Sequence, residues 1–199
     1  MAELRVAYAD ESFLAHDGTG VYVLAAALLP EASWEDARDV MRDLLRAQRP
    51  KAPPGAKLHW AKMPARARIT ATKTVADVGG LHVVAVGAPC PSKRQERARA
   101  ACLKELVREL YDFGVQVLRM EAREKELNDR DRAVVNQARQ MLGLDAEGFR
   151  VEHVPGPVEP LLWLCDIVAG AVRLHRLGES MYREALGDVV LDFDVVTDC

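Results

Sequence analysis

The chain has 199 residues, which is enough to bury a substantial hydrophobic core in one domain. Hydrophobic residues make up 49% and charged residues 29%, a composition typical of soluble globular proteins, and the net charge of −3 excludes a strongly basic nucleic-acid binder. No apolar run reaches the roughly 18 residues that span a membrane, and the first residues are not typical of a signal or transit peptide. We therefore expect a cytoplasmic protein with no membrane partner.

The predicted elements alternate between strands and helices after an opening pair of strands. The first two strands, over 4–9 and 20–29, flank the turn sequence AHDGTG, which predicts an antiparallel hairpin. Apolar runs predict a short strand over 57–60 and further strands over 80–88, 115–120, 149–154 and 188–196, the last at a sheet edge. Amphipathic patterns predict helices over 33–48, 64–78, 93–114, 130–143 (opened by Asn128) and 158–178.

This alternation indicates an α/β fold, in which helices flank a mixed β-sheet that opens with an antiparallel hairpin. One loop rich in Pro and Gly, over 49–56, is too short to separate domains, so residues 1–199 are predicted to form a single domain. The sequence does not determine the oligomeric state, and a homo-oligomer stays open.

The stretch RVAYADES carries two adjacent acids directly after an apolar strand. Asp and Ser are ordinary turn residues, so a chain reversal is one explanation. The other is that the strand positions a carboxylate for chemistry. Along a strand, Asp10 continues the face of Val6 and Tyr8, whereas Glu11 falls on the opposite face. We therefore expect Asp10 to point inward to a site and Glu11 to make an outer contact.

Two further acids stand in unusual places. Asp166 is the single charged residue of PLLWLCDIVAGAV, an otherwise apolar helix, and Glu121 follows the predicted strand over 115–120. An unpaired carboxylate loses several kcal/mol when it leaves water, so Asp166 needs a cation, a metal ion or a donor network. Ala169 and Gly170, one turn later, leave room for a close approach. The alternatives are a core Asp bonded to Arg or backbone, and a solvent-exposed Glu121 in a loop.

Carboxylates from three separate parts of the chain are what a divalent-metal site requires. Asp10, Glu121 and Asp166 offer oxygen ligands of the kind that Mg²⁺ or Mn²⁺ prefers, and clustered carboxylates tolerate each other when a cation neutralises them. Such ions can activate water in phosphodiester cleavage. The cysteines form no CxxC pair, so neither structural zinc nor a disulfide framework is predicted.

Positive charge is concentrated in one window that contains no acid, from Leu44 to Ala76. A charge run is often only a solvated face, but this window is long enough to contact a polyanion. His59 lies within it and is either a general base, a phosphate contact or a structural residue. The predicted contacts to substrate, inside and outside the window, are Ser12, Lys57, Lys62, Arg66, Arg68 and Arg123.

Several of these stretches together resemble one family of proteins. YADES, LHW after a loop, an acid after a later strand, and LLWLCDIVAGAV on a late helix resemble the domain-of-unknown-function 3800 family in order over residues 4 to 176. The resemblance implies a ribonuclease H-like fold with an acidic active site. It implies metal-binding roles for Asp10, Glu121 and Asp166, with His59 near the same pocket.

The chain departs from the pattern of that family at two positions. The family often has an acid before the Leu-His pair, where this chain has Lys57, and it usually has Gly after the DES triplet, where this chain has Phe13. Without that fourth acid, three carboxylates remain unless Glu11 takes its place. This puts catalysis in doubt but not the fold.

The sequence thus supports one leading function and two alternatives. The leading hypothesis is a nuclease that hydrolyses phosphodiester bonds of RNA or DNA with Mg²⁺ or Mn²⁺, using Asp10, Glu121 and Asp166 together with Glu11 and His59. The first alternative is a non-catalytic module that binds nucleic acid or protein and kept the fold. The second is hydrolysis of a small phosphoester. The serine-hydrolase elbow and the Walker and dinucleotide-binding glycine motifs are absent.

Overall fold

The computed structural model describes residues 5–16, 18–144, 148–197 and 199. The strands are β1 (Val6–His16), β2 (Thr19–Leu28), β3 (Leu81–Pro91), β4 (Val117–Glu121), β5 (Arg150–Val154) and β6 (Val190–Val195). The α-helices are α1 (Trp34–Gln48), α2 (Ala65–Val78), α3 (Gln95–Asp112), α4 (Lys125–Met141), α5 (Pro160–Arg176) and α6 (Met181–Leu186). A 3₁₀ turn over Trp60–Lys62 precedes α2.

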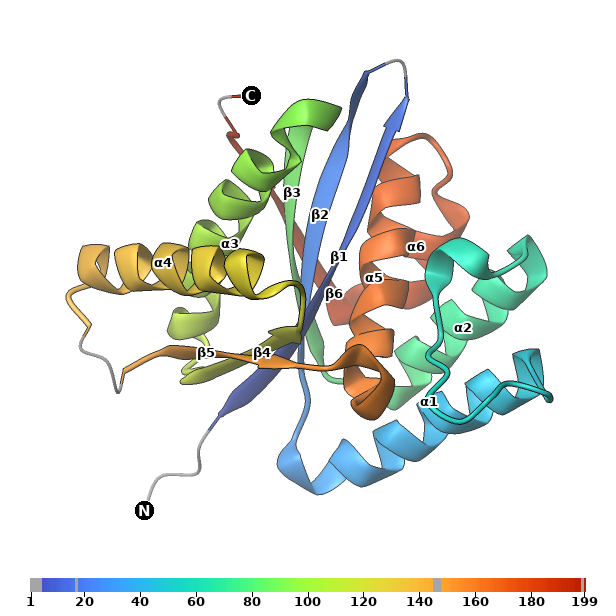
Figure 1. Ribbon diagram of the computed structural model, residues 1–199. Helices are drawn as coiled ribbons and strands as arrows, with labels where there is room; N and C mark the ends of the chain where they lie inside the picture. Colours follow the sequence, from blue (N-terminus) through green and yellow to red (C-terminus); the bar gives the residue numbers. More distant parts are fainter. Residues whose placement is uncertain (1–4, 17, 145–147, 198) are drawn as a thin grey trace.

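The strands form one mixed sheet in the order β5-β4-β1-β2-β3-β6. β2 is antiparallel to both β1 and β3, whereas β1 with β4, β4 with β5, and β3 with β6 are parallel. The predicted α/β class, mixed sheet and opening antiparallel hairpin are therefore confirmed, and β6 lies at an edge as expected (Figure 1).

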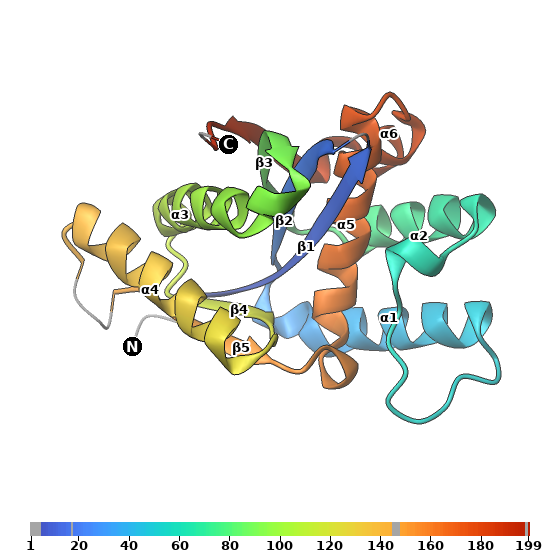
Figure 2. The ribbon, with the colours of Figure 1, turned by 45° about the horizontal axis from the view of Figure 1, so that its top comes forward.

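Helices cover both faces of this sheet (Figures 1 and 2). α5 packs on β1 and β2, with α1, α2 and α6 outside it, while α3 and α4 lie on the other face. Side chains alternate between the two faces along each strand, so Tyr8 contributes to the core under α5, and Ala7 and Ala9 contribute to the core under α3. α5 is apolar nearly all round because it is enclosed between the sheet and the outer helices.

β1 is longer than the strand predicted over 4–9, and this changes the place of the DES triplet. β2 runs alongside β1 in continuous register, with Asp10 opposite Ala25 and Ser12 opposite Val23. The chain reverses only after His16, so the turn explanation for Asp10, Glu11 and Ser12 is wrong. These polar residues lie in the middle of a paired strand, and the ladder with β2 satisfies their backbone groups.

Two other local predictions need correction, and one short helix was missed. Residues 57–60 do not form a strand, because this segment lies against α5 and has no neighbouring strand to pair with. α4 begins at Lys125 rather than at residue 130, since Asn128 sits in its first turn and bonds the backbone N–H and C=O of Arg123. The short helix α6 was not predicted.

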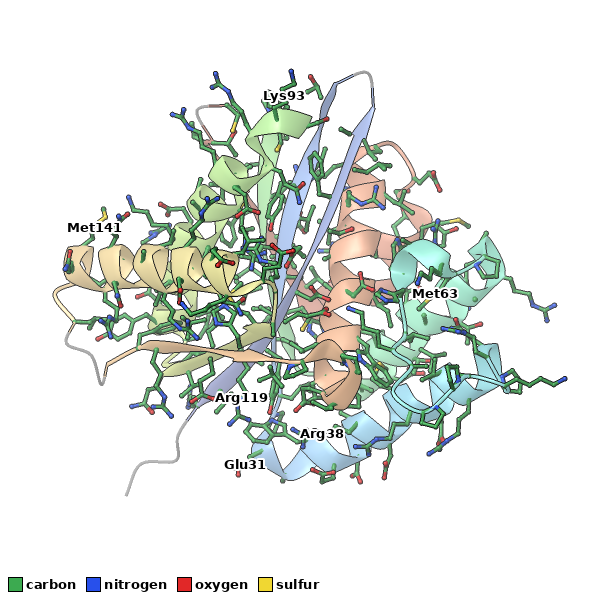
Figure 3. The ribbon with its side chains drawn as sticks, viewed as in Figure 1. Glu31, Arg38, Met63, Lys93, Arg119 and Met141 are labelled. Atoms are coloured by element: carbon green, nitrogen blue, oxygen red, sulfur yellow. The ribbon has the colours of Figure 1, made fainter. Side chains whose placement is uncertain are left out.

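Two arginines from different elements connect α1 and β4 to Tyr8 of β1. The Tyr8 hydroxyl accepts hydrogen bonds from Arg38 of α1 and Arg119 of β4, at 3.1 and 2.9 Å. Figure 3 labels the two arginines. Arg38 also forms a two-pronged ion pair with Glu159, whose carboxylate caps the first turn of α5 at Leu161 N–H. This network fixes α1 and the start of α5 relative to β1.

Within the part of the chain that the structure describes, no helix combines the length and the apolar character needed to cross a lipid bilayer. Cys90, Cys102, Cys165 and Cys199 are all free thiols.

A buried histidine in the sheet generates a prediction about stability and pH. His82 of β3 is fully buried, its ring nitrogens have no hydrogen-bond partner among the described residues, and burial lowers its pKa from 6.5 to about 4. The unfolded chain therefore takes up a proton near pH 6.5, whereas the folded chain does so only near pH 4. The stability that neutral His82 provides is complete above pH 6.5 and is lost as the pH falls towards 4.

We expect His82→Leu to remove up to about 3 kcal/mol of the acid-induced loss of stability between pH 6.5 and 4. Urea unfolding of the wild type and the variant across this range measures the difference. His175→Leu, at an exposed position of α5, is the matched control and should leave the wild-type pH dependence unchanged. Equal pH dependence for wild type and His82→Leu would contradict the prediction.

Candidate functional site

Asp10 lies at the centre of the sheet on the face covered by α5. It is buried, with 7% of its surface exposed, and one carboxylate oxygen accepts the Glu11 N–H at 2.8 Å. The strand register places β4 beside it, because Ala9 pairs with Met120. The next residue of β4 is Glu121, whose carboxyl group lies within hydrogen-bonding reach of Asp10. Two of the predicted acids are thus brought together by parallel pairing of β1 and β4.

Asp166 reaches the same place from α5. It is the only residue between 160 and 174 that is partly exposed rather than buried, on an otherwise enclosed helix. One of its oxygens accepts the backbone N–H of Trp60 at 2.8 Å. The Trp60 segment can come this close because Gly170 has no side chain: a Cβ there would lie 2.2 Å from the indole Cδ1. The room predicted beside Asp166 is filled by Trp60.

Lys57 supplies a positive charge to this acid cluster, by which we mean Asp10, Glu121 and Asp166. Its ammonium group contacts both carboxylate oxygens of Glu121, and both side chains are about four-fifths buried. Gly156 lies against the other side of the Glu121 carboxylate, where a Cβ would come within 2.3 Å of Oε1. The Glu121 carboxylate therefore lies between a cation and a glycine backbone.

The electrostatics of the cluster follow from burial and like charge. Burial, followed by the charges of Glu11, Asp166 and Glu121, raises the pKa of Asp10 well above its ordinary value. Burial also raises the pKa of Asp166 to about 6, although the Trp60 N–H and the charge of Lys57 act in the opposite direction. Both shifts indicate that the cluster attracts a positive charge.

These residues fit a divalent cation in donor type and charge. The donors are carboxylate oxygens, which Mg²⁺ and Mn²⁺ prefer, and the cluster already accepts one cation in the form of the Lys57 ammonium. Among the described residues, however, no group of three or more His, Cys, Asp and Glu side chains is arranged to hold a metal ion.

The predicted basic contacts lie on the α1–α2 side of the cluster. His59, Lys62 and Arg66 line a pocket between these helices, together with Lys57. Burial and the charges of Lys57 and Lys62 lower the pKa of His59, so its imidazole is neutral at neutral pH. Arg68 instead covers the Trp60 ring, with its guanidinium carbon 5.0 Å from the ring centroid.

Ser12 lies next to Asp10 on the same face of β1 and has an unpredicted partner, Arg173. The Arg173 Nε donates to Ser12 Oγ at 2.9 Å, and the guanidinium is buried beside Arg68 and Asp166, which lowers its pKa by burial and by the charge of Arg68. The sequence does contain a signal for this residue, because Arg173 follows Asp166 by two helical turns and so shares its helix face.

Glu11 and Arg123 are not brought to the acid cluster. Glu11 points to the other face of β1, as predicted, and pairs with Arg99 of α3 at 2.7 Å. Arg99 is almost fully buried and also forms a two-pronged pair with Asp131 of α4. Arg123 joins the same network through Glu96 and Asp131, at 2.7 and 3.1 Å. These side chains link α3, α4 and β1 into one buried charge network.

Buried charge networks lose stability steeply when one partner is removed, so Arg99 generates a prediction. Arg99→Met should lower the free energy of unfolding by about 3–5 kcal/mol, because Asp131 would stay buried without its main cation. Arg108→Met, at a half-exposed position of the same helix, should change it by no more than about 0.5 kcal/mol. Urea unfolding at pH 7 compares the two variants, and equal stability would contradict the assignment.

Two glycines of the site should respond differently to the same substitution. Gly170→Ala should cost about 1–3 kcal/mol of stability, because the added methyl group meets the buried Trp60 ring. Gly156→Ala should cost less, because it meets the carboxylate end of Glu121, which can turn away at the expense of its contact with Lys57. Thermal unfolding measures both, and a Gly156 variant less stable than the Gly170 variant would contradict this reading.

Comparison with known proteins bears on the fold. No family model and no curated protein matches the sequence. Among solved structures, the chain is similar to Bst-RNase HIII in complex with Mn²⁺, with 14% identity and a TM-score of 0.52 over 88% of this chain and 54% of that one. It also matches ribonuclease H2 from Pyrococcus horikoshii OT3, with 16% identity and a TM-score of 0.48 over 94% and 81% of the respective chains.

The chain therefore spans about half the length of Bst-RNase HIII. At this level of identity the likeness concerns the fold, and it confirms the predicted ribonuclease H-like arrangement of a mixed sheet flanked by helices. Membership of the domain-of-unknown-function 3800 family stays a prediction.

Proposed function

We propose that this protein is a divalent-metal-dependent nuclease that hydrolyses phosphodiester bonds of RNA or DNA. The observation that carries the proposal is the meeting of Asp10, Glu121 and Asp166, from β1, β4 and α5, at one place beside the sheet. A structural role alone does not account for three like charges that come together while one of them, Asp166, stays partly exposed. The similar Bst-RNase HIII was solved with Mn²⁺, which supports the same ion type here.

In this function the acid cluster holds Mg²⁺ or Mn²⁺. Such an ion, when bound, supplies a nucleophilic water at neutral pH and charge stabilisation for the phosphate. The residues of the chain have their own tasks. The Trp60 N–H fixes one oxygen of Asp166, and Ser12 with Arg173 offers hydrogen-bond donors to a phosphate beside the acids. The neutral imidazole of His59 can accept a proton at the mouth of the site.

One observation favours the alternative of a non-catalytic binding module. Lys57 stands where the resembled family often has an acid, and its ammonium already neutralises Glu121. A protein that had lost its metal could keep the cluster stable in this way. The two functions make different predictions for the removal of Lys57, because a nuclease needs the acids free to bind metal and a binding module does not.

Calorimetric titration with Mn²⁺ tests the metal site directly. The wild type should bind, and Asp166→Asn should weaken binding by at least about tenfold, since even the outer partners of metal ligands have that effect. Lys57→Gln should strengthen binding, because it removes the competing ammonium group. Asp77→Asn, an exposed acid of α2, is the matched control and should bind like the wild type.

Hydrolysis of labelled RNA and DNA strands with Mn²⁺ then tests the chemistry, and the products should disappear with Asp10→Asn or Asp166→Asn. If neither wild type nor Lys57→Gln binds Mn²⁺, the nuclease proposal fails and the binding-module alternative takes its place.

A further inference from the structure

We propose that the pocket between α1 and α2 binds one unpaired nucleotide, so that the protein recognises a single-stranded nucleic acid rather than a continuous duplex. The inference rests on the proposed function, since it names the kind of substrate that the acid cluster acts on. It adds a binding site for the nucleobase, which neither the sequence motifs nor the comparisons assign.

The pocket has the size and the wall chemistry of a ligand site. Its volume is about 400 Å³, within the range of roughly 300–1,000 Å³ that is usual for small-molecule sites. Leu44 of α1, Leu58 of the connecting loop and Met63 before α2 form an apolar floor, and Figure 3 marks its place at Met63. An apolar floor suits the face of a nucleobase, which it contacts through dispersion and the burial of apolar surface with little regard to the identity of the base.

The rim of the pocket carries only positive charge. Arg49, Lys62 and Arg66 line it and are exposed, and among the described residues none of them forms an ion pair with an acid. No acid lies in the lining, which follows from the acid-free window between Leu44 and Ala76. An apolar floor with a cationic rim is complementary to a group that is apolar on one side and anionic on the other, as a nucleotide is.

The pocket and the acid cluster share a wall. Lys57 lines the pocket, and its ammonium group contacts Glu121 of the cluster. His59 also lines the pocket and lies close enough to Glu121 for the carboxylate charge to raise the pKa of the imidazole, against the larger effects that lower it. A nucleotide in the pocket would therefore place the adjoining phosphodiester next to the acids.

The shape of the site selects an unpaired nucleotide. A base within a duplex is stacked and paired, and it can enter a pocket only after it is turned out of the helix at a cost of a few kcal/mol. An unpaired base in a single strand can enter the pocket without this free-energy cost, whereas an intact duplex can contact only the cationic rim. Charge alone would bind both forms, so a preference for the single strand isolates the contribution of the floor.

Fluorescence anisotropy with labelled oligodeoxythymidylate, and with the same strand annealed to oligodeoxyadenylate, tests this in buffer with EDTA, where hydrolysis cannot occur. The single strand should bind at least about tenfold more tightly than the duplex. Lys62→Glu should weaken single-strand binding about tenfold or more and reduce its salt dependence, whereas Lys73→Glu should change it by less than about twofold. Lys73 is the matched control, because it is an exposed lysine of α2 in the same acid-free window but outside the pocket.

Ala67→Phe separates the floor from the rim, because it fills the pocket and leaves every cation in place. This variant should lose the preference for the single strand and keep the wild-type Mn²⁺ titration. The inference is overturned if duplex and single strand bind equally, or if Lys62→Glu and Lys73→Glu have equal effects. The lysine pair decides the question even if Ala67→Phe does not fold.

The outcomes also separate this inference from the proposed function. If the protein binds Mn²⁺ and hydrolyses nucleic acid, but Lys62→Glu weakens single-strand binding no more than Lys73→Glu, the proposed nuclease function stands and the nucleotide pocket is refuted. If the protein prefers the single strand but does not bind Mn²⁺, the nucleotide pocket stands and the proposed nuclease function is refuted.

Discussion

The central constraint on this molecule is the repulsion among carboxylates that the fold brings together away from bulk water. Asp10 and Glu121 lie side by side because their strands are parallel neighbours, and Asp166 faces them from α5. Burial and mutual charge would drive such acids apart or protonate them unless a cation is present. In this structure the cation is Lys57, whose ion pair with Glu121 ties the segment before α2 to β4, and the same lysine lines the pocket.

The two faces of β1 divide the charged residues between two purposes. On the α5 face, Asp10 and Ser12 adjoin a site that is open at Asp166 and has donors left over for a ligand. On the α3 face, Glu11 enters a closed network with Arg99 and Asp131, in which the two carboxylates share the Arg99 guanidinium. The contrast between an open, cation-deficient cluster and a closed, balanced one is the physical basis for assigning function to the first and stability to the second.

Several parts of this arrangement could be predicted from local sequence. Strand and helix patterns predicted the mixed sheet and its opening hairpin, because the period of apolar residues depends on the local backbone. The alternation of side chains along β1 separated Asp10 from Glu11 before any contact was known. The lone acid of α5 and the small residues after it indicated a close partner, which is the Trp60 segment. The extent of β1 was missed, because Asp and Ser are also ordinary turn residues and only the pairing with β2 shows that the strand continues through them.

What the sequence by itself determined is therefore most of the elements of the sheet and its helices, the faces of β1 on which Asp10 and Glu11 lie, and the acid-free window that supplies the cationic rim. Only the tertiary structure decided which charges meet. Three pairs join residues that are far apart in the chain: Lys57 with Glu121, Glu11 with Arg99, and Ser12 with Arg173. Such contacts cannot be predicted from local sequence patterns. Arg123 shows the consequence: beside Glu121 in the sequence it is a plausible phosphate contact, but the packing of α4 against α3 turns it to Glu96 and Asp131. Local patterns depend on neighbours along the chain, whereas charge pairing depends on how helices and strands pack.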